Sequence, residues 1–333
     1  MAITNSILSQ PIFIAGTPRS GTTWVANVLE QARNTRLIKE PDNEKYSFLA
    51  LWWKNNHHRF PFSEINNENP GFAKFYAEIF KGNYLPNRTV LNNTLLFLFG
   101  FTKAKTEKLI QEKEAKLMLG SHHYSVSRSF IYINRLLNLF SLQRWKYYDR
   151  LVVKSVHSCL LLPLISELYK PKMLLIFRHP ANVVASNLKL GLHDGNRKLY
   201  MRPEIINSYL HPFLEKINEL NDPLEFQGLQ VGIFYYIWEK WLQMNPSWIT
   251  INHEELCINP VESFKLLYEK LNLPWSVKVE EYITNQNKEG EGFTTQRLAE
   301  NEINKWKTTL KKDQIEKIRQ GYYTFPLAHY NDF

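Results

Sequence analysis

Residues 11–24 read PIFIAGTPRSGTTW, and this stretch decides the fold. The apolar run at 11–16 predicts a buried β-strand, and a helical pattern follows at 22–33. Between them, Gly16 and Gly21 allow a tight turn that brings backbone N–H groups together at the start of the helix. Such a helix start binds anions. The stretch therefore predicts a strand, a phosphate-binding loop and a helix.

The side chains of this loop add charge and hydroxyl groups to the backbone donors. Arg19 supplies a guanidinium, while Ser20, Thr22 and Thr23 supply hydroxyls. An ordinary nucleotide-triphosphatase loop, G-x-x-x-x-G-K-[ST], would carry lysine at the position of Thr22. Here the cation stands inside the loop instead, where it faces the terminal group of a bound anion. A strand followed by a merely capped helix is the structural alternative.

Three further segments resemble the first strand, because each is a short apolar run that ends in polar or basic residues. They are LVVK at 151–154, MLLIFR at 173–178 and WITIN at 248–252. Helical patterns cover 160–169, 181–190, 232–244 and 261–271. This alternation predicts an α/β fold, with a parallel sheet of about four to five strands flanked by helices.

We expect one domain over residues 1–333, interrupted by two largely helical insertions at 42–150 and 191–230. Insertions over the carboxyl edge of an open α/β sheet contact ligands, so both are expected to bind an acceptor. The first insertion is rich in aromatic side chains that predict either an apolar or sugar-stacking cleft or ordinary core packing. They are Trp52, Trp53, Phe60, Phe62, Phe72, Phe75, Tyr76 and Phe80.

Bulk properties limit the function classes. The 333 residues are 44% hydrophobic, enough for a large core without disulfides, and the two cysteines, Cys159 and Cys257, are expected to be buried thiols. No signal sequence or apolar run of membrane-spanning length occurs, so we expect a cytoplasmic protein without a transmembrane segment. The net charge of +9 favours an anionic partner, but no nucleic-acid-binding motif accompanies it, and nucleic acid is not expected.

A second anion site is predicted after the strand at 173–178. Arg178 ends this strand, and Ser186 follows eight residues later, two turns into the next helix. The two side chains can converge on one phosphate. Together with the loop, this site fits a nucleotide phosphorylated at both its 5′ and 3′ positions.

These motifs resemble the sulfotransferase family that uses 3′-phosphoadenosine 5′-phosphosulfate (PAPS). Residues 18–23 match its 5′-phosphosulfate loop, P-[KR]-S-G-T-T, in the arginine version of tyrosylprotein and many bacterial enzymes. The resemblance is specific over 11–23 and 154–186, weaker as far as 318, and absent from the insertions. It implies PAPS as the cofactor, adenosine 3′,5′-bisphosphate as the product and no metal. The implied cofactor-binding residues are Pro18, Arg19, Ser20, Gly21, Thr22, Thr23, Trp24, Arg178 and Ser186.

The resemblance also implies the catalytic residues. Glu40 stands 21 residues after Arg19, where related enzymes carry the general base. His157 competes for this role, since LVVKSVHSCLLLP resembles the K-T-H-L-P-x-x-L-L-P segment of cytosolic relatives. Its histidine is displaced by one position, so His157 is ranked second, as a base or acceptor contact. Lys154, with Arg19, is expected to stabilise charge on the departing phosphate.

Two late segments resemble the family more weakly. In ITINHEELCINP, His253 stands where tyrosine is usual, and Trp306 and Lys307 belong to a W-K segment expected to bind the cofactor. The R-K-G triplet that binds the 3′-phosphate in cytosolic relatives is missing. Arg297, Lys305 and Lys307 are the candidates to replace it.

The predicted reaction is in-line transfer of a sulfuryl group from PAPS to a hydroxyl or amine. The acceptor class stays open among small molecules, lipids and carbohydrates. Two alternatives remain. A P-loop kinase or nucleotide triphosphatase would require ATP and magnesium, and a non-catalytic module would only bind nucleotides or anions.

Overall fold

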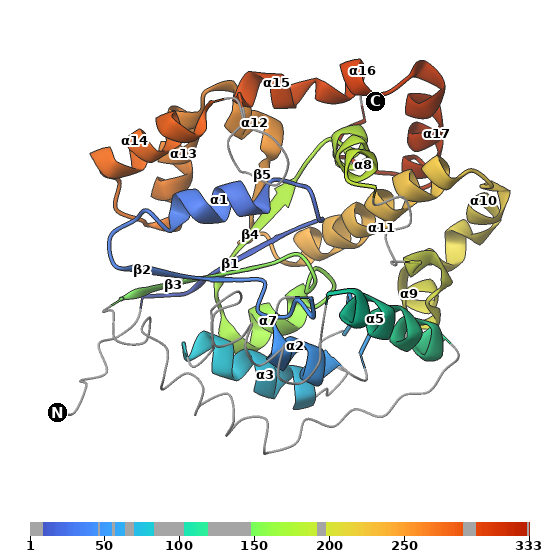
Figure 1. The fold of residues 1–333 in the computed structure, drawn as a ribbon, viewed down its shortest axis with the longest axis horizontal. Helices are drawn as coiled ribbons and strands as arrows, with labels where there is room; N and C mark the ends of the chain where they lie inside the picture. The colour runs from blue at the N-terminus through green and yellow to red at the C-terminus, as the bar shows by residue number, and fades with distance from the viewer. Residues whose placement is uncertain are drawn as a thin grey trace. The chain divides into compact units, whose positions relative to one another are not determined.

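The structure is a computed structural model, which describes residues 9–45, 47–54, 57–63, 70–82, 103–118, 148–191, 198–288, 298–331 and 333. Five strands form one parallel sheet in the order β2-β3-β1-β4-β5 (Figure 1). Contacts divide the chain into two compact units: unit 1 holds residues 1–15 and 33–173, and unit 2 holds 16–32 and 174–333. The predicted α/β class is confirmed.

Unit 1 contains β2 (Thr35–Lys39), β3 (Arg150–Ser155) and β1 (Ile12–Gly16) except for its last residue. Strand β3 pairs in parallel with both neighbours, and its Lys154 stands in register with Ile14 of β1 and Lys39 of β2. The sequence did not predict β2. Its second residue, Arg36, breaks the apolar run, yet this side chain is buried and donates to the carbonyl of Gly82.

The described helices of unit 1 are α2 (Phe48–Trp53), α3 (Pro70–Phe80), α5 (Lys103–Met118) and α7 (Leu162–Tyr169). Helix α3 packs against α7 and β3 (Figure 1). The aromatic residues of the insertion form the core here: Trp53 stacks on Phe75 with ring centroids 4.0 Å apart. Six of them are buried, namely Trp53, Phe60, Phe72, Phe75, Tyr76 and Phe80. Core packing therefore explains these six.

Unit 2 contains β4 (Lys172–Phe177), except for its first two residues, and β5 (Ile249–Asn252), which pair in parallel. Its helices before β5 are α1 (Thr22–Leu29), α8 (Pro180–Lys189), η3 (Leu199–Met201), α9 (Pro203–Ile205), η4 (Ile206–Leu210), η5 (His211–Phe213), α10 (Leu214–Glu219) and α11 (Pro223–Met244). Those after β5 are α12 (His253–Ile258), α13 (Pro260–Leu271), α14 (Val277–Gln286), α15 (Ala299–Ile303), α16 (Lys305–Thr309) and α17 (Lys312–Tyr322).

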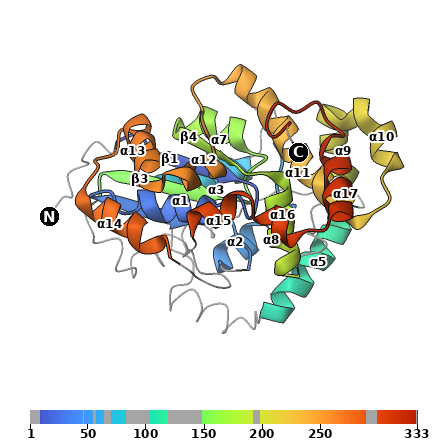
Figure 2. The same cartoon turned by 90° about the horizontal axis from the view of Figure 1, so that it is seen from above.

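Helix α11 begins earlier than the predicted segment 232–244. Asp222 caps it, accepting from the N–H of Leu224 at 2.8 Å, and Glu225 completes a capping box. Helix α17 runs beside α11 in both views (Figures 1 and 2). The approach is close, because a Cβ on Gly321 would lie only 1.8 Å from the carbonyl oxygen of Glu225. Helix α8 packs against both helices, and Tyr235 and Trp238 of α11 contact Phe177 at the end of β4.

Both cysteines are buried and free, as predicted. Among the described residues, no helix has the length and apolar character needed to cross a membrane. Cys257 lies against His253, with its Sγ 3.6 Å from Nδ1, and burial raises the pKa of its thiol to about 12.

Candidate active site

The predicted phosphate loop follows β1 in unit 2 and has an unusual backbone. Arg19 and Gly21 adopt left-handed conformations, with φ of 75° and 88°. The N–H of Ser20 donates to the carbonyl of Thr17 at 3.0 Å, which closes the turn before α1. A Cβ on Gly21 would lie 2.1 Å from Cδ2 of His253. Glycine is therefore required at position 21 both by its φ and by its close neighbour.

The loop presents polar atoms that fit an anion. The Ser20 hydroxyl and the Arg178 Nε are buried and have no hydrogen-bond partner in the described part of the chain. Burying such groups without a partner costs about 1–3 kcal/mol each. A bound phosphate would satisfy both, since both can donate to its oxygens.

The two predicted anion sites meet at Arg19. Its Nε donates to the hydroxyl of Ser186 at 2.9 Å, and its carbonyl accepts from Nη1 of Arg178 at 2.9 Å. Tyr235 holds the backbone of Arg178, accepting from its N–H at 2.8 Å and donating to its carbonyl at 2.6 Å. Arg19 of the loop thus meets both residues of the second predicted anion site, Arg178 and Ser186, in one contiguous basic site.

A carboxylate that the sequence did not predict joins this site. Glu302 of α15 accepts from Nη2 of Arg178 at 2.8 Å, and its other oxygen is ion-paired with Lys305. The pKa of Glu302 is lowered, because the pull of Arg178 and Lys305 outweighs the effect of burial. Of the three candidates to replace the missing triplet, Lys305 is therefore linked to Arg178. Arg297 lies outside the described residues.

Trp306 packs next to the same strand end. Its ring stacks on His179, with centroids 4.5 Å apart and planes 9° from parallel. Its backbone N–H donates to Oδ1 of Asn182 at 3.1 Å. Lys307 places its ammonium 5.3 Å from the Trp306 ring centroid. These contacts bring the late W-K segment to the residues that follow Arg178 in the chain.

Trp24, also predicted to bind cofactor, packs against protein side chains. Its ring meets His253 at 5.7 Å and Phe264 at 5.0 Å, both edge to face. His253 is buried, and burial, followed by the charge of Arg178, lowers its pKa well below the usual value. This histidine is therefore a neutral neighbour of Gly21.

In unit 1, the two predicted catalytic residues Glu40 and Lys154 form an ion pair. Glu40 directly follows β2 with a left-handed φ of 47°, and its N–H donates to the carbonyl of Lys154 at 2.7 Å. Its second carboxylate oxygen accepts from the N–H of Val156 at 3.1 Å. The carboxylate is thus held by the last residues of β3 and the turn that follows.

Asp42, which the sequence did not single out, holds the turn that follows β3. Its carboxylate accepts from Ser155 at 2.7 Å, from Tyr76 at 3.2 Å and from Ser158. Ser155 in turn accepts from the backbone N–H groups of His157 at 3.0 Å and Ser158 at 3.1 Å. The network joins the turn after β2 to the turn after β3, and so fixes both sides of the Glu40 and Lys154 pair.

His157, the second candidate base, is buried in this network. Its Nε2 accepts from Nε of Arg59 at 3.3 Å, and its Nδ1 lies 3.4 Å from both the carbonyl of Asp42 and Nζ of Lys54. Burial, followed by the charges of Lys54 and Arg59, lowers the pKa of His157 well below its usual value. Its accepting nitrogen already has a donor, and its surroundings oppose protonation.

The comparisons with known proteins agree with these motifs. The sequence model described as "Sulfotransferase family" matches residues 11–277. No curated protein sequence matches the chain significantly. Among solved structures, a sulfotransferase domain from the curacin biosynthetic pathway is 17% identical, with 95% of this chain and 98% of that chain covered and a TM-score of 0.41.

Two further solved structures are similar at the same level. A mouse sulfotransferase complexed with PAP is 12% identical, covering 94% of this chain and 83% of its own, with a TM-score of 0.40. A Mycobacterium avium sulfotransferase is 15% identical, covering 97% and 78%, with a TM-score of 0.42. Since the family model spans most of the sequence, this chain belongs to the sulfotransferase family and is a transferase.

Proposed function

We propose that this enzyme transfers the sulfuryl group of PAPS to a hydroxyl or amine of an acceptor. The observation that carries the proposal is the basic site of unit 2, where Arg19 bonds both Ser186 and Arg178. Donors of this kind fit a ligand with phosphate groups at two positions. The unpartnered Ser20 hydroxyl and Arg178 Nε add donors of the same kind.

The proposal assigns the two ends of PAPS to two sets of residues. The loop residues Pro18, Arg19, Ser20, Gly21, Thr22 and Thr23 would hold its 5′ end, and Arg178, Ser186 and Lys305 would hold its 3′-phosphate. Trp306, Lys307 and Trp24 would line the nucleotide from the side of the protein. Bound PAPS would supply an activated sulfuryl group with a phosphate as its leaving group.

Glu40 is the proposed general base. Its side chain is 16% exposed, and Val156 and Lys154 fix both of its carboxylate oxygens. Fixing a base in this way lowers the cost of aligning it with the acceptor proton. His157 supports the proposal indirectly, because it is buried and its Nε2 already accepts from Arg59.

Lys154 is the proposed electrostatic catalyst, together with Arg19. Its ammonium is 5% exposed and ends β3, and the next residue, Ser155, stands in register with Ala15. Ala15 is the residue directly before Gly16, where the phosphate loop begins. A fixed ammonium at this position would stabilise the negative charge that grows on the leaving phosphate.

We further propose that the chain works as one cytoplasmic domain on a small-molecule, lipid or carbohydrate acceptor. The test has two parts. Adenosine 3′,5′-bisphosphate should raise the melting temperature by mass action, and ATP with magnesium should not. Labelled PAPS should then label a member of a mixed acceptor pool. Stabilisation by ATP and magnesium alone would indicate a kinase or triphosphatase, and nucleotide binding without any transfer would indicate a non-catalytic module.

A further inference from the structure

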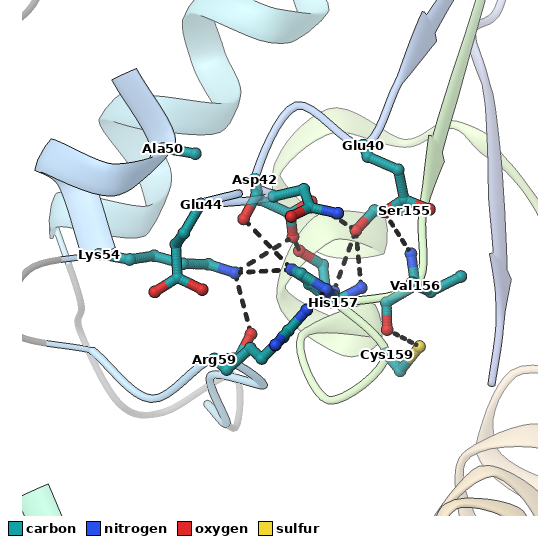
Figure 3. Close-up of polar contacts among 12 residues, drawn as sticks. Glu40, Asp42, Glu44, Ala50, Lys54, Arg59, Ser155, Val156, His157 and Cys159 are labelled. Atoms are coloured by element: carbon teal, nitrogen blue, oxygen red, sulfur yellow. Dashed lines mark hydrogen bonds and ion pairs between the residues drawn. The ribbon is translucent and has the colours of Figure 1, made fainter. Parts of the chain in front are cut away.

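Arg59, in the first insertion of unit 1, is held at three of its polar atoms. Its carbonyl accepts from Nζ of Lys54 at 2.9 Å and its Nε donates to His157 at 3.3 Å (Figure 3). Its backbone N–H donates to Glu114 at 2.6 Å. The two terminal nitrogens of the guanidinium are the remaining polar atoms. They make no hydrogen bond or ion pair within the described residues.

The residues that hold Arg59 are costly to bury. Lys54 is wholly inaccessible to solvent, and burial lowers the pKa of its ammonium despite the nearby charge of Asp42. His157 is 2% exposed. A solvated surface arginine needs no such support, since an exposed guanidinium gains little from being fixed. The arrangement instead fixes the orientation of the guanidinium.

Within the described residues, no carboxylate forms an ion pair with the guanidinium of Arg59. Lys154 pairs with Glu40, Lys113 pairs with Glu44, and Lys54 lies 3.9 Å from Asp42. The remaining acid, Glu114, contacts the backbone N–H of Arg59 and the ring of His58 rather than the guanidinium. Arg59 is half-buried, so its free end is accessible to an anion.

The guanidinium is connected to the proposed base through one short turn. His157, which accepts from Arg59, donates its own N–H to Ser155 at 3.0 Å, and Val156 between them donates to Glu40. All of these residues belong to unit 1, whereas the proposed donor-binding residues belong to unit 2 except for Lys154. Arg59 therefore belongs to the same unit and the same hydrogen-bond network as the proposed base.

We propose that Arg59 binds an anionic group of the acceptor, and that the acceptor is a hydroxyl or amine compound carrying a carboxylate, phosphate or sulfate. The proposal rests on the proposed function, because it assigns the acceptor of that reaction. A planar guanidinium binds each of these groups through two parallel hydrogen bonds. His157 is then a positioning residue: in its neutral form it accepts from Nε and leaves both terminal nitrogens for the ligand.

The experiment uses acceptor pools built as matched pairs, each an acid and its neutral amide or ester, over phenols, alkyl alcohols and sugars. With adenosine 3′,5′-bisphosphate saturating, ligand-observed NMR measures binding, and labelled PAPS measures kcat/KM. The parent protein should favour the acid of a pair. Arg59→Ala should weaken binding of that acid about tenfold to a hundredfold and leave its neutral partner unchanged.

Three controls make the result specific. Arg59→Lys should keep part of the preference, because it retains the charge but loses the planar fork. Lys108→Ala removes an exposed cation of the same insertion and should change nothing. Separate pools of carboxylate, phosphate and sulfate acceptors would show which anion is recognised.

Two results would overturn the inference. One is equal binding of acids and neutral partners by the parent, and the other is loss of affinity for adenosine 3′,5′-bisphosphate in Arg59→Ala, which would assign Arg59 to the donor. Failure of the proposed function is different, since it would show as binding without any sulfuryl transfer from PAPS. His157→Asn should weaken the acid preference in the same direction as Arg59→Ala, by a smaller factor.

Discussion

Glu302 Oε2 lies 2.8 Å from Nη2 of Arg178, so a carboxylate binds the guanidinium that we assign to the 3′-phosphate. Its other oxygen is paired with Lys305. A phosphate binding to Arg178 and Lys305 would compete with this carboxylate for the same donors, and two anions cannot share them without repulsion. A phosphate that binds Nη2 of Arg178 and Lys305 would therefore displace Glu302, whereas Nε of Arg178 stays available to it.

Glu302→Gln should tighten the binding of adenosine 3′,5′-bisphosphate by about threefold to tenfold, because the competing charge is gone. Glu300→Gln, on the same helix and exposed, is the matched control and should not change affinity. Calorimetry at constant ionic strength measures both. Weaker binding in Glu302→Gln would mean that the carboxylate organises the site rather than blocking it.

Arg19→Ala and Arg178→Ala test the two halves of the donor site. Each removes charge-assisted hydrogen bonds worth about 1.5–3 kcal/mol, so each should weaken adenosine 3′,5′-bisphosphate binding by about one to two orders of magnitude. Circular dichroism should show that both variants remain folded. If a folded variant binds like the parent, that arginine does not hold the nucleotide.

The residues that meet around Arg19, which we propose bind the anion, could be chosen from the sequence because their signals are local. The loop at 16–22 and the pair Arg178 and Ser186 each lie within a few residues of a strand end, where the sheet fixes their place. Strand β2 was missed because the buried Arg36 made it look polar, although that charge bonds the carbonyl of Gly82.

The acceptor half was less predictable because its contacts join distant segments. Asp42 bonds residues 113 and 116 positions away, and Arg59 meets His157 across 98 positions. No periodicity or motif marks such a pair in a single sequence. Glu302 was missed for the same reason, since it reaches Arg178 across 124 positions.

The Asp42 network should contribute strongly to stability. Asp42→Ala leaves Lys54 buried without its nearest carboxylate, and breaking a buried pair in this way costs about 3–5 kcal/mol. Asp42→Asn should cost less, because the amide still accepts from one hydroxyl. Urea denaturation measures the free energy of unfolding, with the exposed Asp313→Ala as control. A loss below about 1 kcal/mol in Asp42→Ala would contradict the role of the network.

The buried histidines should make stability depend on pH. The pKa values of His157 and His253 are lowered well below the usual value, chiefly by burial. The unfolded chain therefore takes up protons near pH 6.5 that the folded protein does not, so stability falls as the pH drops from 7 to 5. The slope should approach about 1.4 kcal/mol per pH unit for each histidine.

His157→Gln should flatten this pH dependence, since it removes one of the two groups. Urea denaturation at a series of pH values gives the slope, and His211→Gln, at an exposed position, is the control. An unchanged slope in His157→Gln would show that folding does not lower the pKa of His157.

The last prediction separates the two candidate bases, because a base acts on the acceptor and contributes little to holding the nucleotide. Glu40→Gln keeps the size and hydrogen-bonding capacity of the side chain but cannot accept the proton. Turnover should fall by roughly two to four orders of magnitude, with nucleotide affinity nearly unchanged. His157→Asn should lower kcat much less and act mainly on the KM of acidic acceptors, through Arg59. Calorimetry with adenosine 3′,5′-bisphosphate and kinetics on both variants make the comparison. An active Glu40→Gln beside an inactive His157→Asn would transfer the role of base to His157.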